Sequence, residues 1–200
     1  MSNRCYLTTS DVERIYPGFQ NPAFDEAESW VLCSAECVPL LWLPLFGDGD
    51  LATARFTTEE GEIDATAPLA KRVDAIEHLR GCAPFLDRLF ADNGCIGGHL
   101  SLFVSFLSRC KGEYVTLQLD EIARLYPTEA EFDNLLRQCL AGIRYRRPNV
   151  REDIIALSTV MPERRFVPYE QLAVQGHQED WWNFFRIMGE SYLRNDVPWA

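Results

Sequence analysis

The chain has 200 residues, 47% hydrophobic and 24% charged, which is the balance of a globular protein and excludes a disordered chain. The formal net charge of −11 disfavours nucleic acid as a direct ligand, because phosphates would be repelled. The polar N-terminus has no signal-peptide core and no apolar run approaches the roughly 18 residues of a membrane helix, so we expect a cytoplasmic protein with no membrane partner.

The negative charge is concentrated near the N-terminus, where residues 1–66 hold 12 acidic and 3 basic side chains. Such a field attracts a basic protein partner, although the charge can equally serve solubility alone. The seven cysteines are odd in number and scattered, which indicates reduced thiols, most of them buried as small core residues.

The first third of the chain predicts strands. Residues 3–9 and 30–34 are β-rich. The apolar run at 38–46 is interrupted by Pro39 and Pro44, so we interpret it as a buried strand and not a helix. The Gly-Asp-Gly-Asp sequence at 47–50 then predicts a tight turn into a returning strand at 51–57.

The rest of the chain predicts helices around one further strand, Gly112 to Leu117. Thr66 and Pro68 suit a helix start, and Gly81 suits its end. Thr128 and Glu131 form a capping box before a regular apolar stripe. The expected helices cover residues 66–81, 84–92, 99–109, 119–126, 129–142, 149–158 and 178–194.

These elements predict a single α+β domain over residues 1–200, since no Pro-, Gly- and Ser-rich linker divides it. Residues 1–66 are expected to be mainly strands and acidic, and residues 67–200 mainly helices. The fold should be a small antiparallel sheet, built from the N-terminal third plus Gly112–Leu117, and packed by about six helices.

Two surfaces are candidates for binding a partner. The first is the acidic stretch from 48 to 64, which can meet basic side chains, although such runs are more often solvated loops. The second is an aromatic cluster near the C-terminus, where two adjacent tryptophans cannot share one buried helix face. The candidate residues are Asp48, Asp50, Glu59, Glu60, Glu62, Asp64, Trp181 and Trp182.

Catalytic and metal-binding patterns are weak. Cys95 and His99 are four residues apart, so a thiol and an imidazole could meet, but Gly97 and Gly98 lie between them and make a helix doubtful. Cys33 and Cys37 have zinc-like spacing without a second pair. We therefore expect no metal, no cofactor and no assigned catalytic residue.

Two short segments carry a resemblance. The opening Met1–Leu7 (MSNRCYL), and the strand 112–117 (GEYVTL) before Asp120-Glu121-Ile122, resemble a group of uncharacterised bacterial proteins whose N-termini read Asn-Arg-x-Tyr-Leu. Small acidic proteins of this kind are similar to immunity proteins that neutralise secreted bacterial toxins. The resemblance implies no active site.

The leading hypothesis is therefore a binding protein that occludes a basic toxin or enzyme. A cysteine-dependent hydrolase or transferase using Cys95 and His99 is the first alternative. The second is a structural subunit of a self-associating complex, for example a homodimer through the Trp181–Trp182 segment.

Overall fold

The computed structural model describes residues 3–16, 31–35, 37–58, 61–89, 95–158 and 187–191. Within these ranges, six strands form one antiparallel sheet in the order β3-β4-β5-β1-β2-β6. The strands are β1 (Arg4–Ser10), β2 (Val31–Ala35), β3 (Leu51–Thr58), β4 (Gly61–Lys71), β5 (Tyr114–Gln118) and β6 (Glu190–Ser191). This confirms the predicted α+β class and the antiparallel sheet that includes the strand after Gly112.

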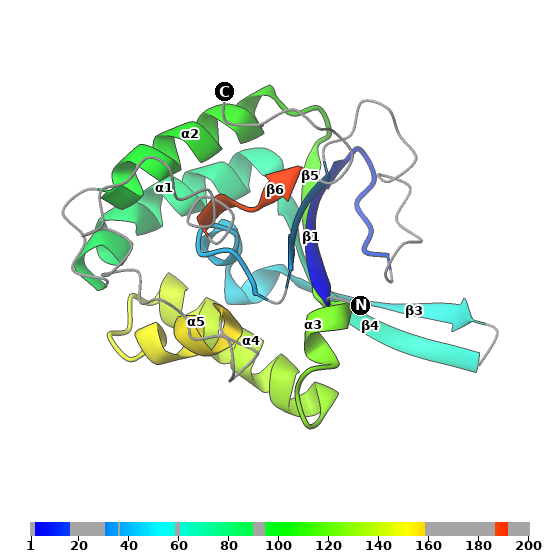
Figure 1. Ribbon diagram of the computed structural model, residues 1–200. Helices are drawn as coiled ribbons and strands as arrows, with labels where there is room; N and C mark the ends of the chain where they lie inside the picture. Colours follow the sequence, from blue (N-terminus) through cyan, green and yellow to red (C-terminus); the bar gives the residue numbers. More distant parts are fainter. Residues whose placement is uncertain are drawn as a thin grey trace.

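The helices lie together against one face of the sheet (Figure 1). They are α1 (Arg72–Leu89), α2 (Cys95–Arg109), α3 (Asp120–Ala123), α4 (Glu129–Arg144) and α5 (Val150–Ser158). Two short 3₁₀ turns, η3 (Leu43–Leu45) and η4 (Asp48–Asp50), precede β3. The described residues thus hold five α-helices against the predicted set of about six, because α1 covers parts of two of the seven expected ranges and the range 178–194 lies mostly outside the described residues.

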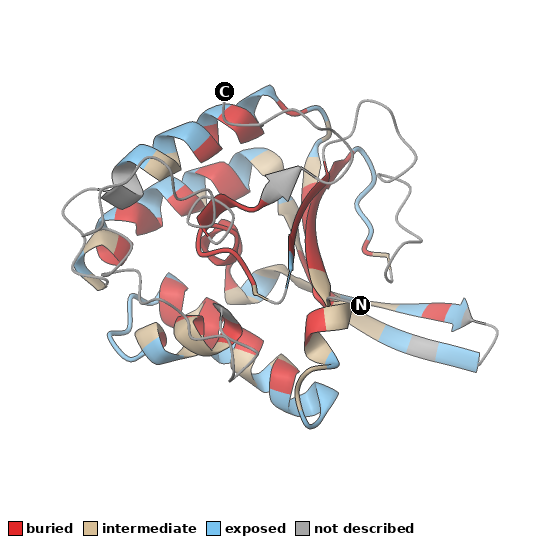
Figure 2. Cartoon of the chain, viewed as in Figure 1, coloured by how far each residue is buried: buried red, intermediate tan, exposed pale blue. Residues whose placement is uncertain are grey.

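The apolar run at 38–46 forms the centre of the core, but the prediction that it is a strand is wrong. It folds as turns and η3, and it lies between the helices and the sheet in Figure 1. Every residue from Val38 to Phe46 is buried (Figure 2). A strand here would need ladder donors that Pro39 and Pro44 lack, and the chain instead buries apolar side chains in all directions.

Backbone hydrogen bonds connect this central segment to two later parts of the chain. Val38 N donates to Leu157 O at 3.3 Å, and Leu41 N donates to Ile187 O at 3.0 Å. The indole Nε1 of Trp42 donates to Met188 O at 2.8 Å. These bonds satisfy polar groups that burial would otherwise leave without a partner.

Three further predictions need correction. Residues 61–71 are strand β4 and pair with β3, so the helix expected from Thr66 begins only at Arg72. That helix does not end at Gly81, because α1 continues through Pro84 to Leu89. The last predicted helix, 178–194, falls mostly outside the described residues; its part at 187–188 is helical, and its part at Glu190–Ser191 is strand β6.

The hairpin of β3 and β4 extends beyond the body of the protein (Figure 1). Strand β4 pairs with β5 only from Leu69 to Lys71, whereas it pairs with β3 from Gly61 to Pro68. We call residues 51–58 and 61–68 the ribbon. Its two strands follow the alternation of side chains that a two-stranded antiparallel pair requires.

Candidate functional site

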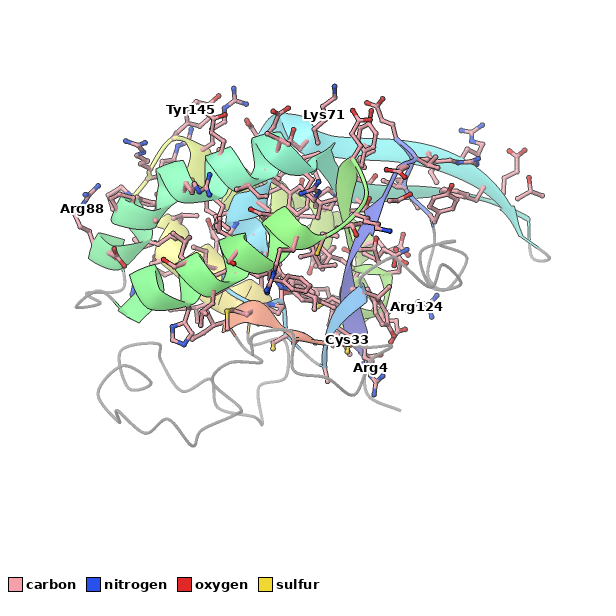
Figure 3. All side chains as sticks on the ribbon, turned by 90° about the horizontal axis from the view of Figure 1, so that it is seen from above. Arg4, Cys33, Lys71, Arg88, Arg124 and Tyr145 are labelled. Carbon is pink, nitrogen blue, oxygen red and sulfur yellow. The ribbon has the colours of Figure 1, made fainter. Side chains whose placement is uncertain are left out.

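A cleft of about 430 Å³ opens where η4, α1 and the end of α4 meet. Its lining includes three basic side chains and two acidic ones. They are Lys71, Arg144 and Arg146, and Asp50 and Asp74. Figure 3 shows Lys71 and the neighbouring Tyr145 on the same side of the molecule. The size of the cleft falls in the range of small-molecule sites.

Asp48 and Asp50, both predicted to bind a partner, form contacts within the chain at this cleft. Asp48 Oδ1 accepts from Arg144 at 2.7 Å, and that contact raises the pKa of the guanidinium. Asp50 Oδ2 accepts from Gly47 N at 2.6 Å and fixes the η4 turn. These carboxylates therefore hold the wall of the cleft in place, which reduces what they can offer a partner.

The turn after α4 places an arginine in an unusual backbone conformation. Arg146 has a φ of 54° and is the one non-glycine residue with positive φ among the described ranges. Arg146 N donates to Ile143 O and Arg147 N donates to Gly142 O, which is the helix ending that usually has glycine at this position. A side chain there costs about 1–2 kcal/mol, and its guanidinium lines the cleft.

A thiol and an imidazole also line the cleft. The Cys82 Sγ and His78 Nε2 atoms are 3.9 Å apart, and His78 Nδ1 is 3.0 Å from Pro44 O. If Nδ1 donates to that carbonyl, Nε2 is left to accept a proton from the thiol. Burial raises the pKa of Cys82 to about 11, although Arg146 lowers it in part, so the thiol stays protonated at neutral pH.

The pair considered from sequence, Cys95 and His99, lies on one helix after all. Residues 95–109 form α2 despite Gly97 and Gly98, so the two residues are separated by about one helical turn. His99 is half-buried, and the side chain of Cys95 lies outside what the structure describes. Among the described side chains, Cys82 and His78 form a close thiol–imidazole contact.

The ribbon displays the two other described acidic candidates. Glu62 and Asp64 lie on its exposed face with Arg55, Thr53 and Thr66. Arg55 binds Asp64 through two hydrogen bonds of 2.8 and 3.3 Å, and its NH1 is 3.8 Å from Glu62. The hydrogen bond from Arg55 lowers the pKa of Asp64.

The opposite face of the ribbon is apolar and packs on the segment after β1. Phe56 and Ala67 are buried with Ile15, and the Arg14 guanidinium lies 5.6 Å from the Phe56 ring centre. This packing runs along the ribbon, from Ala67 near its base to Phe56 nearer its tip, and leaves the charged face exposed (Figure 2).

The acidic candidates do not form one cluster. Asp48 and Asp50 precede β3 at the base of the ribbon, whereas Glu62 and Asp64 lie nearer its tip. Glu59, Glu60, Trp181 and Trp182 lie outside the described residues. Where the structure describes the chain, no three His, Cys, Asp or Glu side chains are grouped to hold a metal ion, and no helix is long and apolar enough to cross a membrane.

Comparisons with protein-family models, curated proteins and solved structures find no match to this chain.

Proposed function

We propose that this protein binds a basic protein partner and occludes it, using the exposed face of the ribbon as the main contact. More specifically, we propose a cytoplasmic bacterial immunity protein that neutralises a cognate toxin. The observation that favours it most is the projection of a charged ribbon, clear of the helices, from a chain of net charge −11.

Charge supports the choice of partner. Residues 51–66 contain four acidic side chains and one basic side chain, a net of −3. Arg55 neutralises Asp64 in part, but all three charged side chains of this face are more than half exposed. Exposed pairs of this kind contribute little stability, so a partner's arginine or lysine can compete for the carboxylates at low cost.

The shape of the ribbon supports occlusion. A two-stranded arm that reaches beyond its own sheet can enter a concave site on a partner, where its polar face would be desolvated. Complementary charge mainly accelerates encounter and selects the partner. The aromatic pair Trp181 and Trp182 remains a proposed second contact.

The experiment mixes the protein with basic proteins encoded by the neighbouring genes and follows complex formation on a sizing column, then by affinity at two salt concentrations. The Glu62→Lys, Asp64→Lys variant should bind on the order of tenfold or more weakly. Glu77→Lys on the exposed face of α1 makes a control of the same chemistry.

A second variant separates charge from shape. Arg55→Gln removes the internal competitor for Asp64, so a basic partner should bind more tightly and with steeper salt dependence. Affinity that is unchanged by salt and by the three ribbon substitutions, Glu62→Lys, Asp64→Lys and Arg55→Gln, would reject the ribbon as the contact. Elution of the protein alone as a dimer, without any complex, would favour the self-associating subunit.

The second candidate function is thiol chemistry, which the contact between Cys82 and His78 favours over the pair Cys95 and His99. The cleft supplies space and cations for a substrate, but burial holds Cys82 in its protonated form. Thiol alkylation at pH 7 that is fast at Cys82, and slowed by His78→Ala, would move this candidate ahead.

A further inference from the structure

Three cysteines lie near the end of the pairing between β1 and β2. Cys5 pairs with Ser34 in the strand register, and Cys33 pairs with Tyr6. Because side chains alternate along a strand, Cys5 faces the helical core whereas Cys33 packs with Tyr6 and Val31 on the other face. The sheet therefore separates the Cys5 side chain from the Cys33 side chain.

Cys37, just past β2, lies on the same side as Cys5. Cys5 Sγ donates to Cys37 O at 3.1 Å and makes a longer contact of 3.8 Å with Ser34 O. Cys37 Sγ is 3.2 Å from the hydroxyl of Ser34. A fully buried thiol thus lies against the residue whose own thiol is half-buried and open in part to solvent.

We propose that Cys5 and Cys37 form an oxidative modification site, in which a hydroperoxide converts the two thiols into a disulfide. Both cysteines are reduced in the structure. The proposal is independent of the partner-binding function above, since neither residue lies on the ribbon or in the cleft.

The reaction has two steps. The Cys37 sulfur attacks hydrogen peroxide, the O–O bond breaks, and Cys37 becomes a sulfenic acid while one water leaves. The Cys5 sulfur then attacks the Cys37 sulfur, an S–S bond forms, and the S–O bond breaks. The departing hydroxide takes the Cys5 proton and leaves as a second water, so the peroxide is reduced and the two thiols are oxidised.

The surroundings set the order of these steps. Cys37 is the more exposed thiol, and a hydrogen bond donated by the Ser34 hydroxyl would stabilise its thiolate. Burial and the neighbouring Cys37 raise the pKa of Cys5 well above its usual value. Cys5 is therefore protected from direct oxidation and acts as the slower, resolving thiol.

The bond would connect β1, a central strand, to the start of the buried segment 38–46. It would close the chain between residues 5 and 37, which includes all of β2. Because a cross-link of this kind restricts the unfolded chain, the oxidised protein should unfold at higher temperature than the reduced one.

The test treats the folded protein with hydrogen peroxide, blocks remaining thiols with iodoacetamide under denaturing conditions, and maps the peptides without reduction. Trypsin and a glutamate-specific protease together separate the three thiols, because Glu13, Arg14 and Glu36 lie between them. The expected product is a cross-link between peptides 5–13 and 37–55. Its mass is two hydrogen atoms less than the sum of the two thiol peptides, and dithiothreitol reverses it.

Variants assign the roles. Cys33→Ser should leave the cross-link intact, whereas Cys37→Ser should abolish it. In Cys5→Ser, the reaction should stop at a sulfenic acid on Cys37 that dimedone traps. If Cys5→Ser does not fold, the Cys37→Ser variant, which changes a half-buried side chain, still tests whether the cross-link needs Cys37.

The proposal is overturned if wild-type Cys37 is oxidised without linking to Cys5, if the link joins Cys33 to Cys37, or if peroxide produces only cross-links between two chains.

Discussion

Replacing Trp42 with phenylalanine tests the packing that holds the central segment. Trp42 is fully buried, and its indole donates to Met188 O at 2.8 Å. Phenylalanine keeps an aromatic ring but has no N–H, so it leaves that carbonyl without its donor. It also leaves empty the space of the second indole ring.

The two losses can be given rough sizes. A buried carbonyl deprived of its partner costs about 1–3 kcal/mol. The missing ring atoms lose burial and contacts worth about 1 kcal/mol or somewhat more. The sum, about 2–4 kcal/mol, is a large share of the 5–15 kcal/mol that typically separates folded and unfolded proteins.

Urea unfolding followed by far-ultraviolet circular dichroism measures this without relying on tryptophan emission. Val73→Ala is the control, because Val73 is 68% exposed and should change stability by less than about 0.5 kcal/mol. Gly189→Ala is an independent second perturbation, since Gly189 has a φ of 82° and an added Cβ would collide with the Trp42 ring. If Trp42→Phe unfolds within about 0.5 kcal/mol of wild type, the reasoning is refuted.

Three further predictions concern α4, the turn after it and the cleft. Gly142→Ala should destabilise by about 1–2 kcal/mol despite alanine's helix propensity, because its Cβ would lie 2.5 Å from Val150 Cγ2 and 2.7 Å from Val150 Cβ. Val150→Ala removes only the Cγ contact and should relieve this in part in a double-mutant cycle. Arg146→Gly should stabilise by about 0.5–1 kcal/mol in urea unfolding, whereas Arg147→Gly, at an ordinary φ, should destabilise. Between about pH 9 and 11, the free energy of unfolding of the wild type should fall by about 2–3 kcal/mol relative to that of Cys82→Ala. The pKa of Cys82 is raised to about 11 in the folded protein, so the thiol of the unfolded chain ionises first as the pH rises, which favours unfolding. Parallel pH curves would contradict this.

Local signals predicted the elements in which one feature dominates. Thr128 Oγ1 accepts from Glu131 N at 3.2 Å, as the capping box predicted, and α4 buries the stripe that includes Phe132, Leu136 and Cys139. Strands β1, β2, β3 and β5 also fall close to the predicted ranges. In these places, sequence pattern and tertiary packing favour the same structure.

Prediction failed where packing overrides a local breaker. Gly81 and Pro84 indicate helix ends by themselves, yet α1 continues through both because it buries Leu79, Cys82 and Leu86 against the core. Ending the helix at Gly81 separated His78 from Cys82, so their contact in the cleft was missed. The spacing of four residues was the signal that could have found it.

The partner of β3 was also mistaken. The Asp-Gly sequence at 48–49 suggested a hairpin with the preceding apolar run, but η4 forms there, held by Asp50 and Gly47. Strand β3 pairs instead with β4, whose first residue, Gly61, has a φ of 129° that favours glycine. Burial on all sides gave the apolar run no alternating pattern to reveal its true conformation.

The central claim is that the ribbon is the surface that a basic partner covers. Hydrogen–deuterium exchange of the complex with a basic protein from the neighbouring genes tests it most directly. We predict slower exchange in peptides spanning 51–58 and 61–68, with α1 and α2 unchanged. A stable complex that slows exchange only in the helices, and leaves the ribbon as in the protein alone, would contradict the claim.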